Sequence, residues 1–163
     1  MNIFDQAMKI ESEGMGLYRQ FALESPNEGM RNIFTWLADQ ETKHYKVFEA
    51  MKLGKPAQVA ESAILRDVKD IFEEWKDKTP CIEINAPQTV LYRKALEVEK
   101  KSVSVYETYA KTAPASQKEI FLMIAGQEKG HRFIMENIIE FVTKPETWAE
   151  NAEFSHLDED YYL

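Results

Sequence analysis

The chain has 163 residues, of which 44% are hydrophobic and 29% charged, a balance typical of a soluble globular domain with its own core. The net charge of −8 makes nucleic acids and anionic membrane surfaces poor partners. No apolar run reaches the about 18 residues that a membrane span requires, and the first residues do not resemble a signal peptide. The one cysteine, Cys81, excludes an internal disulfide. We therefore expect a cytoplasmic protein.

The first third of the chain predicts two long helices joined by a short turn. Apolar residues recur at helical spacing from about Ile3 to Glu24 and again in the following segment. Ser25 is predicted to cap the second helix, with Glu28 completing a capping box. Gly54 is expected to end that helix.

Residues 55–87 differ from the flanking helices because they contain several proline and asparagine breaks. A shorter amphipathic helix is predicted within this connection. Cys81, next to a proline, is expected to be a buried structural thiol. The predicted helix rests on apolar residues at helical spacing: Ile64, Leu65, Val68, Ile71, Phe72 and Trp75.

The last part of the chain predicts a second pair of long helices and a tail. The third long helix is expected over roughly Gln88 to Thr112. A capping box over Ser116–Glu119 is predicted to begin the fourth long helix, and Pro145 is predicted to end it. Residues 1–145 thus form the bundle domain. The acidic tail 146–163 is predicted to dock on the bundle or on a second subunit through its aromatic residues Trp148, Phe154, Tyr161 and Tyr162.

The predicted fold class is therefore all-α. Each short turn joins two helices into an antiparallel hairpin, and a connection of about thirty residues carries the chain from one hairpin to the next. These segments make a four-helix bundle of two antiparallel helix hairpins with a long crossover that carries a short helix.

A repeated set of polar residues stands within these helices. The motif Glu-x-x-His occurs twice, 87 residues apart, and each copy follows a Glu that has a Tyr seven residues after it. Neighbouring apolar residues and a glutamine before each motif repeat as well. The first set is Glu11, Tyr18, Glu41 and His44, and the second is Glu99, Tyr106, Glu128 and His131.

Residues three apart share a helix face, so each Glu-x-x-His motif presents a carboxylate and an imidazole together. Four buried carboxylates need compensation, and two divalent cations balance their charge. We predict a dinuclear site in which Glu41 and Glu128 bridge the metals and each histidine binds one ion. The other two glutamates would bind on the outer sides, with the tyrosines as hydrogen-bond donors to carboxylates. Glu13 and Glu97 are expected to face solvent.

The motifs resemble those of the rubrerythrin family within the ferritin-like superfamily, and the resemblance covers nearly the whole chain, including Pro145-Glu146-Thr147-Trp148. It implies a ferritin-like bundle with a non-haem di-iron centre that reacts with hydrogen peroxide or O2, often in defence against oxidative stress. Rubrerythrins also place a further ligand Glu one turn after the third-helix Glu, where this chain has Ser102 and Val103. Full-length rubrerythrins also carry a rubredoxin domain with cysteine pairs, whereas Cys81 is the one cysteine here. The resemblance therefore implies an external electron donor such as a rubredoxin.

Two functional hypotheses follow. In the first, the protein is an oxidoreductase that reduces peroxide or oxidises Fe(II). In the second, the same site belongs to a non-catalytic metal-binding or iron-handling protein. A bundle that serves only for interactions has no feature in its favour. The ligands suit two Fe ions but also Mn or Zn. Aromatic residues and the apolar tail predict a homodimer.

Overall fold

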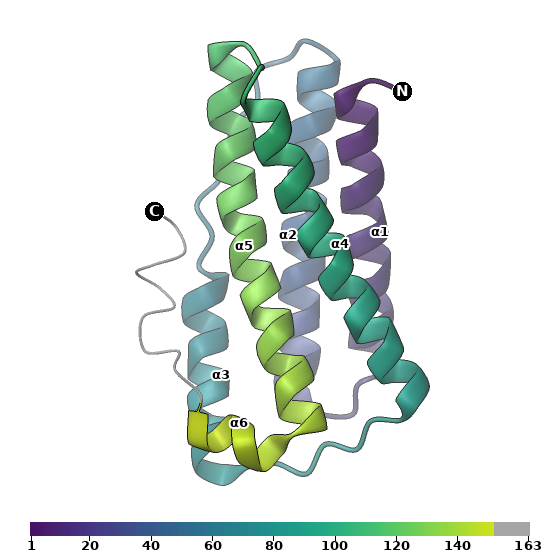
Figure 1. Ribbon diagram of the computed structural model, residues 1–163, viewed down its shortest axis with the longest axis vertical. Helices are drawn as coiled ribbons and strands as arrows, with labels where there is room; N and C mark the ends of the chain where they lie inside the picture. The colour runs from purple at the N-terminus through teal and green to yellow at the C-terminus, as the bar shows by residue number, and fades with distance from the viewer. Residues whose placement is uncertain (152–163) are drawn as a thin grey trace.

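The computed structural model describes residues 1–151, and within this range the chain forms six helices and no strand (Figure 1). The predicted all-α fold is confirmed, and the four long helices form the bundle. The helices are α1 (Ile3–Glu24), α2 (Glu28–Lys52), α3 (Ile64–Lys78), α4 (Ala86–Ala110), α5 (Ala115–Thr143) and α6 (Pro145–Asn151).

Asparagine caps three of the helices. The side chain of Asn2 accepts a hydrogen bond from the first turn of α1, Asn27 does the same for α2, and Asn85 for α4, at 2.8 to 2.9 Å. The prediction that Ser25 caps α2 is wrong, because the amide of Met30 bonds to Asn27, which lies two residues nearer the helix.

The predicted capping box at the start of α5 is also wrong. The helix begins at Ala115, and its cap residue is Pro114, which has no side-chain donor or acceptor. The prediction for the end of α2 holds at Gly54, whose φ of 68° lies in the left-handed region that glycine adopts without strain. The amide of Lys55 then bonds to the carbonyl of Ala50 at 2.8 Å and closes the helix.

The long helices are not evenly spaced around the bundle. The close contacts join α1 to α2, α4 to α5 and α1 to α4. Helices α2 and α5 are not among the closely contacting pairs, although both carry a Glu-x-x-His motif. The crossover leaves the end of α2 and passes to the outer side of α5 before α3 begins (Figure 1).

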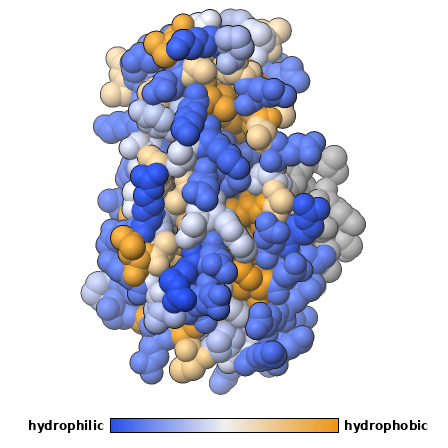
Figure 2. Space-filling model, turned by 180° about the vertical axis from the view of Figure 1, so that it is seen from behind, coloured by the Kyte–Doolittle hydropathy of each residue, from blue (hydrophilic) through white to orange (hydrophobic). Residues whose placement is uncertain are grey.

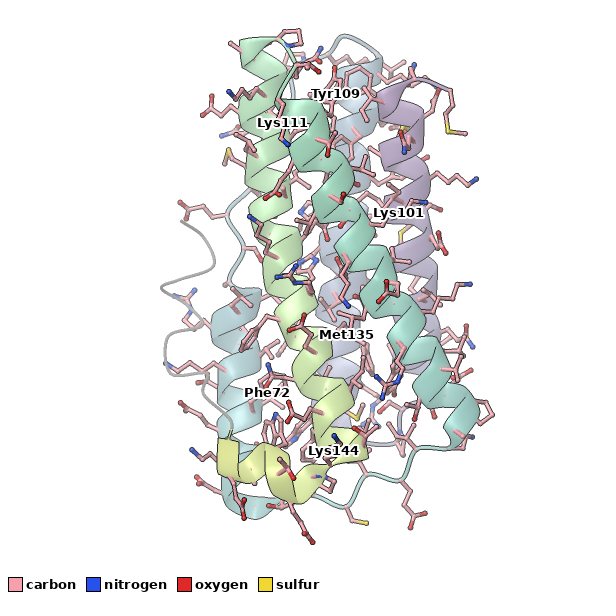
Figure 3. All side chains as sticks on the ribbon, in the orientation of Figure 1. Phe72, Lys101, Tyr109, Lys111, Met135 and Lys144 are labelled. Atoms are coloured by element: carbon pink, nitrogen blue, oxygen red, sulfur yellow. The ribbon has the colours of Figure 1, made fainter. Side chains whose placement is uncertain are left out.

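The crossover helix α3 and the short helix α6 cover one end of α5 (Figure 1). Trp148 of α6 is 1% exposed, and its ring centroid lies 5.9 Å from that of Phe72 on α3 and 5.0 Å from that of Phe141 on α5. Phe72 lies between α3 and α5 (Figure 3). The other aromatic residues of the tail, Phe154, Tyr161 and Tyr162, lie outside the described residues.

Cys81 is exposed, so the expectation of a buried structural thiol is wrong. It lies in the irregular segment between α3 and α4, where Ile82 and Ile84 pack partly against the core while the thiol is exposed at the surface.

Two clusters of aromatic side chains fill the bundle on either side of its middle. The first contains Tyr18, Phe21, Phe34 and Tyr92, whose neighbouring ring centroids lie 4.7 to 6.4 Å apart. The second lies around Phe121, whose ring centroid is 4.6 to 6.3 Å from those of four other rings. The members of this second cluster are Phe4, Phe48, Tyr106, Tyr109 and Phe121.

The surface seen from behind is mainly hydrophilic, with hydrophobic residues in small separate groups (Figure 2). Among the described residues, no helix is long and apolar enough to cross a membrane.

Candidate metal centre

The six predicted ligands come from all four long helices and meet in the middle of the bundle. Helix α1 supplies Glu11, α2 supplies Glu41 and His44, α4 supplies Glu99, and α5 supplies Glu128 and His131. All six side chains are buried, with at most 2% of each residue exposed. The three-residue spacing places each motif's carboxylate and imidazole on one inward face, as predicted.

These side chains form two groups that could each hold a metal ion. Within each group, one ligand atom from every residue lies within 4.8 Å of the others. Glu41 and Glu128 belong to both groups, which is the placement that bridging carboxylates require. The first group adds Glu11 and His44, and the second adds Glu99 and His131.

Both histidines turn Nδ1 toward the carboxylates. His44 Nδ1 lies 2.7 Å from Glu128 Oε1 and 3.4 Å from Glu11 Oε2. His131 Nδ1 lies 3.0 Å from Glu41 Oε1 and 3.3 Å from Glu128 Oε2. The two imidazole rings are nearly parallel, with centroids 5.7 Å apart. Nδ1 is therefore the atom that each histidine offers to a cation at the centre.

The two repeated tyrosines bind the outer carboxylates across the bundle. The hydroxyl of Tyr18 on α1 donates to Glu99 Oε1 on α4, and that of Tyr106 on α4 donates to Glu11 Oε1 on α1. Burial, and then the charge of the carboxylate that each one contacts, raises the pKa of both tyrosines well above the usual value. Both hydroxyls thus stay protonated and orient the glutamates, and the other oxygen of Glu11, Oε2, lies 3.4 Å from His44 Nδ1 at the centre.

Burial raises the pKa of three of the glutamates. For Glu41 and Glu99 the pKa lies well above 4.5, because burial disfavours the charged carboxylate and the charge of Glu128 adds repulsion. The pKa of Glu11 is raised for the same two reasons.

Glu128 differs from the other three glutamates. Burial alone would raise its pKa, but the hydrogen bond with Glu99 and the charges of His44 and His131 hold that pKa well below 4.5. For His44, burial alone would lower the pKa, but Glu128 and Glu11 raise it well above 6.5. A metal-free centre thus concentrates its negative charge on Glu128 and retains protons on its neighbours.

The residues fit a pair of metal ions. Three buried polar atoms around the centre have no hydrogen-bond partner among the described residues: Glu11 Oε2, Glu128 Oε2 and His131 Nε2. Unsatisfied buried polar atoms are unfavourable, and a cation would satisfy the two carboxylate oxygens. Carboxylate and imidazole donors suit Fe, Mn and Zn, so the donor set does not choose among them.

Two residues near the centre were not predicted from the sequence. Gln127 accepts a hydrogen bond from His44 Nε2 at 2.6 Å through Oε1 and donates to the carbonyl of Ala60 at 2.9 Å. The repeat could have indicated a role for Gln127, since Gln40 and Gln127 directly precede the two Glu-x-x-His motifs. Gly14 leaves space for Glu41, because a Cβ there would lie 3.3 Å from Glu41 Oε2. Nothing in the sequence indicated that Gly14, within a helix, lies beside Glu41.

The neighbouring acidic residues lie outside the centre. Glu13 and Glu97 are exposed, as predicted, and Glu97 pairs with Lys100 at 3.2 Å. Ser102, one turn after Glu99, is 1% exposed and donates its hydroxyl to the carbonyl of Glu99 at 2.7 Å. This serine is therefore buried, but its hydroxyl donates its hydrogen bond to the backbone and not to a ligand.

Comparison with known proteins agrees with this class of fold and site, an all-helical bundle with a buried cluster of glutamates and histidines. The family model described as Rubrerythrin matches residues 2–59, which cover α1, α2 and the start of the crossover. The match confirms the predicted resemblance to the rubrerythrin family over these residues, which include Glu11, Tyr18, Glu41 and His44, whereas the resemblance of the rest of the chain stays a prediction. Neither the curated proteins nor the solved structures gave a significant match. The role of the six residues as metal ligands stays a prediction.

The shared carboxylates predict a metal stoichiometry. We expect two metal ions per chain, and we expect Glu41→Ala or Glu128→Ala to lose most of both ions, because each substitution removes a residue common to both groups. Metal content by elemental analysis after equilibration with Fe(II) or Zn(II) checks this. Glu97→Ala, an exposed glutamate two residues from Glu99, is the matched control and should keep both ions. A stoichiometry of one, or full retention in both bridge variants, would contradict the shared-bridge arrangement.

The pKa shifts predict how pH affects the metal-free protein. Raised folded-state pKa values of Glu11, Glu41 and Glu99 mean that the folded chain binds more protons above about pH 4.5, so stability falls as pH rises. The raised pKa of His44 acts in the same direction above pH 6.5, whereas the lowered pKa of Glu128 removes stability only in acid.

Urea unfolding at several pH values, with and without metal, measures this dependence. The free energy of unfolding of the metal-free protein should decrease from mildly acidic to alkaline pH. Bound metal should largely abolish the decrease, because cations replace the protons on the carboxylates. Superimposable curves for metal-free and metal-loaded protein would show that these carboxylates do not govern stability.

Proposed function

We propose that the protein is a non-haem di-iron oxidoreductase of rubrerythrin type that reduces hydrogen peroxide, or oxidises Fe(II) with O2 or peroxide. The observation that carries this proposal is the pair of ligand groups that share Glu41 and Glu128 in a fully buried setting. The family match supports iron as the metal. The proposed reductant is a separate protein such as a rubredoxin, and the proposed assembly is a cytoplasmic homodimer.

The charges of the centre support a redox role. Two divalent ions balance four carboxylates, so the reduced centre is neutral within a bundle interior that disfavours net charge. When bound, two iron ions would supply the two electrons that, with two protons, reduce one peroxide to two waters. The chain's own groups hold protons beside the centre: the hydroxyls of Tyr18 and Tyr106 stay protonated against the outer carboxylates. Aromatic rings on both sides keep bulk water out.

The turn after Glu99 sets a limit on this chemistry. A glutamate in this turn would add a carboxylate ligand, but Ser102 donates its hydroxyl to the backbone and Val103 is apolar. We therefore propose slower peroxide turnover than in rubrerythrins that have the extra glutamate.

The decisive experiment is anaerobic loading with Fe(II) followed by hydrogen peroxide or O2. We expect oxidation to the ferric state, seen as new near-ultraviolet absorption, with one peroxide consumed for every two irons. Reduced rubredoxin should return the centre to the ferrous state. If neither oxidant changes the spectrum of fully loaded protein, the oxidoreductase proposal fails and the non-catalytic metal-binding function takes its place.

The tyrosines give a further prediction. Tyr18→Phe or Tyr106→Phe should change the rate of oxidation or the metal affinity by roughly 10- to 100-fold, because each removes a hydrogen bond that orients an outer carboxylate. The aromatic contacts remain, so the helical content should not change. Tyr109→Phe is the control, since its hydroxyl donates to Gln117 at 2.6 Å and not to the centre. Equal effects of all three substitutions would show that the tyrosine–glutamate bonds have no special role.

A further inference from the structure

A cavity of about 380 Å³ lies between α2, the crossover and Gln127 of α5. Its volume falls in the range of small-molecule pockets, which start at about 300 Å³. Apolar residues of α2 and the crossover form part of its wall, including Val47, Ala57 and Val59. His44 and Gln127 also line it, so the cavity extends to a residue of the metal centre.

The arrangement of the bundle leaves the side with the cavity as the route by which a small molecule can approach the metal centre. The two aromatic clusters fill the bundle on both sides of the ligands, and most of their rings are fully buried. The close contacts of α1 with α2, of α4 with α5 and of α1 with α4 fill three of the lateral seams. The remaining seam lies between α2 and α5. Helix α3 contacts both of these helices, and the cavity has residues of both in its wall.

The inner end of the cavity is polar and is closed by Gln127 together with His44. Gln127 bonds to His44 Nε2 at 2.6 Å and to the carbonyl of Ala60 at 2.9 Å, so its amide spans from the metal centre to the crossover. His44 turns its other nitrogen, Nδ1, to the carboxylates. The imidazole ring of His44 and the amide of Gln127 thus separate the cavity from the carboxylates of the centre.

The mouth of the cavity is positive in a chain with a net charge of −8. Lys43 and Lys46 line it, both are exposed, and neither forms an ion pair within residues 1–151. A local positive charge on an acidic protein raises the rate at which small anions arrive.

The repeat counterpart of Lys43, next to the second histidine, is Gly130, and helix α3 covers it. Gly130, next to His131, is buried, and a Cβ there would lie 3.1 Å from Leu65 Cδ1 of α3. The crossover helix therefore presses against α5 where the repeat would place a counterpart of Lys43. The two halves of the centre thus differ in their surroundings, and the His44 half is the one beside the cavity.

We propose that this cavity is the entrance through which small anions and hydroperoxides reach the His44 side of the centre, and that Gln127 closes its inner end. The volume and the apolar wall accommodate hydroperoxides with a short organic group as well as hydrogen peroxide. The inference rests on the metal site of the proposed function but not on its redox chemistry.

Azide binding to the cobalt(II)-loaded protein tests the entrance without any redox step. Azide is a small anion, and its coordination changes the visible spectrum of cobalt, so stopped-flow absorption gives a binding rate. Ala57→Trp places a large ring in the cavity and should slow azide binding by about tenfold or more. Val90→Trp is the control, because Val90 is 65% exposed on α4 and does not line the cavity. Equal rates in both variants and the original protein, or no azide binding at all, would overturn the proposal.

Two further comparisons separate the mouth from the inner end. Lys43→Gln with Lys46→Gln should lower the azide rate by on the order of twofold or more and weaken its salt dependence, whereas Lys101→Gln on α4 (Figure 3) should not. Gln127→Ala should raise the rate at full cobalt occupancy, whereas Gln20→Ala, at an exposed glutamine of α1 outside the cavity wall, should leave it unchanged. An unchanged rate in Gln127→Ala would remove Gln127 from the entrance.

The iron form then distinguishes the two proposals and tests the organic substrates. With Fe(II), Ala57→Trp should slow oxidation by tert-butyl hydroperoxide more than oxidation by hydrogen peroxide, because the larger oxidant needs more of the cavity. If iron is inert to both oxidants while azide binding still depends on Ala57, the entrance stands and the redox function fails. If iron reacts with both at rates that Ala57→Trp does not alter, the redox function stands and the entrance proposal fails.

Discussion

Four carboxylates buried in the middle of a helical bundle are the constraint on which the rest of this structure depends. Isolated carboxylates in such an interior are unfavourable by several kcal/mol each, so they must be protonated, paired or bound to cations. The metal-free chain combines the first two, with raised pKa values on Glu11, Glu41 and Glu99 and a charged Glu128 between two histidines. Cations would replace both arrangements at once, so the cluster has the composition that a metal site requires.

The surrounding residues follow from this constraint. A centre that holds charge needs a dry and rigid setting, and the aromatic clusters provide it on both sides while each contributes one tyrosine hydroxyl to a carboxylate of the other hairpin. The bonds of Tyr18 with Glu99 and of Tyr106 with Glu11 therefore also connect α1 to α4, the one close contact between the two hairpins among the long helices. Orientation of the ligands and association of the hairpins are thus produced by the same side chains.

The sequence predicts the bundle well because helical periodicity is set by many buried residues at once, and the bounds predicted for α1 agree with the structure. It predicts caps poorly, since a cap depends on one hydrogen bond that Asn27 forms in place of Ser25. The six clustered residues were predictable because the repeat and helix geometry place them on inward faces. Gln127 was not, because its bond to Ala60 depends on the path of the crossover, which has no periodic pattern. The exposure of Cys81 depends on that same irregular path.

The crossover has a consequence for symmetry. The two helical hairpins are related by a repeat in sequence, and two identical separate hairpins could associate with an exact twofold axis between the two ligand groups. A single chain that joins the two hairpins has one linker, and no second linker exists that the twofold axis could relate to it. In this protein the linker bonds to Gln127 on one side and presses Leu65 against Gly130 on the other. Covalent connection alone thus gives the two ligand groups chemically distinct surroundings, even where their residues are of the same types.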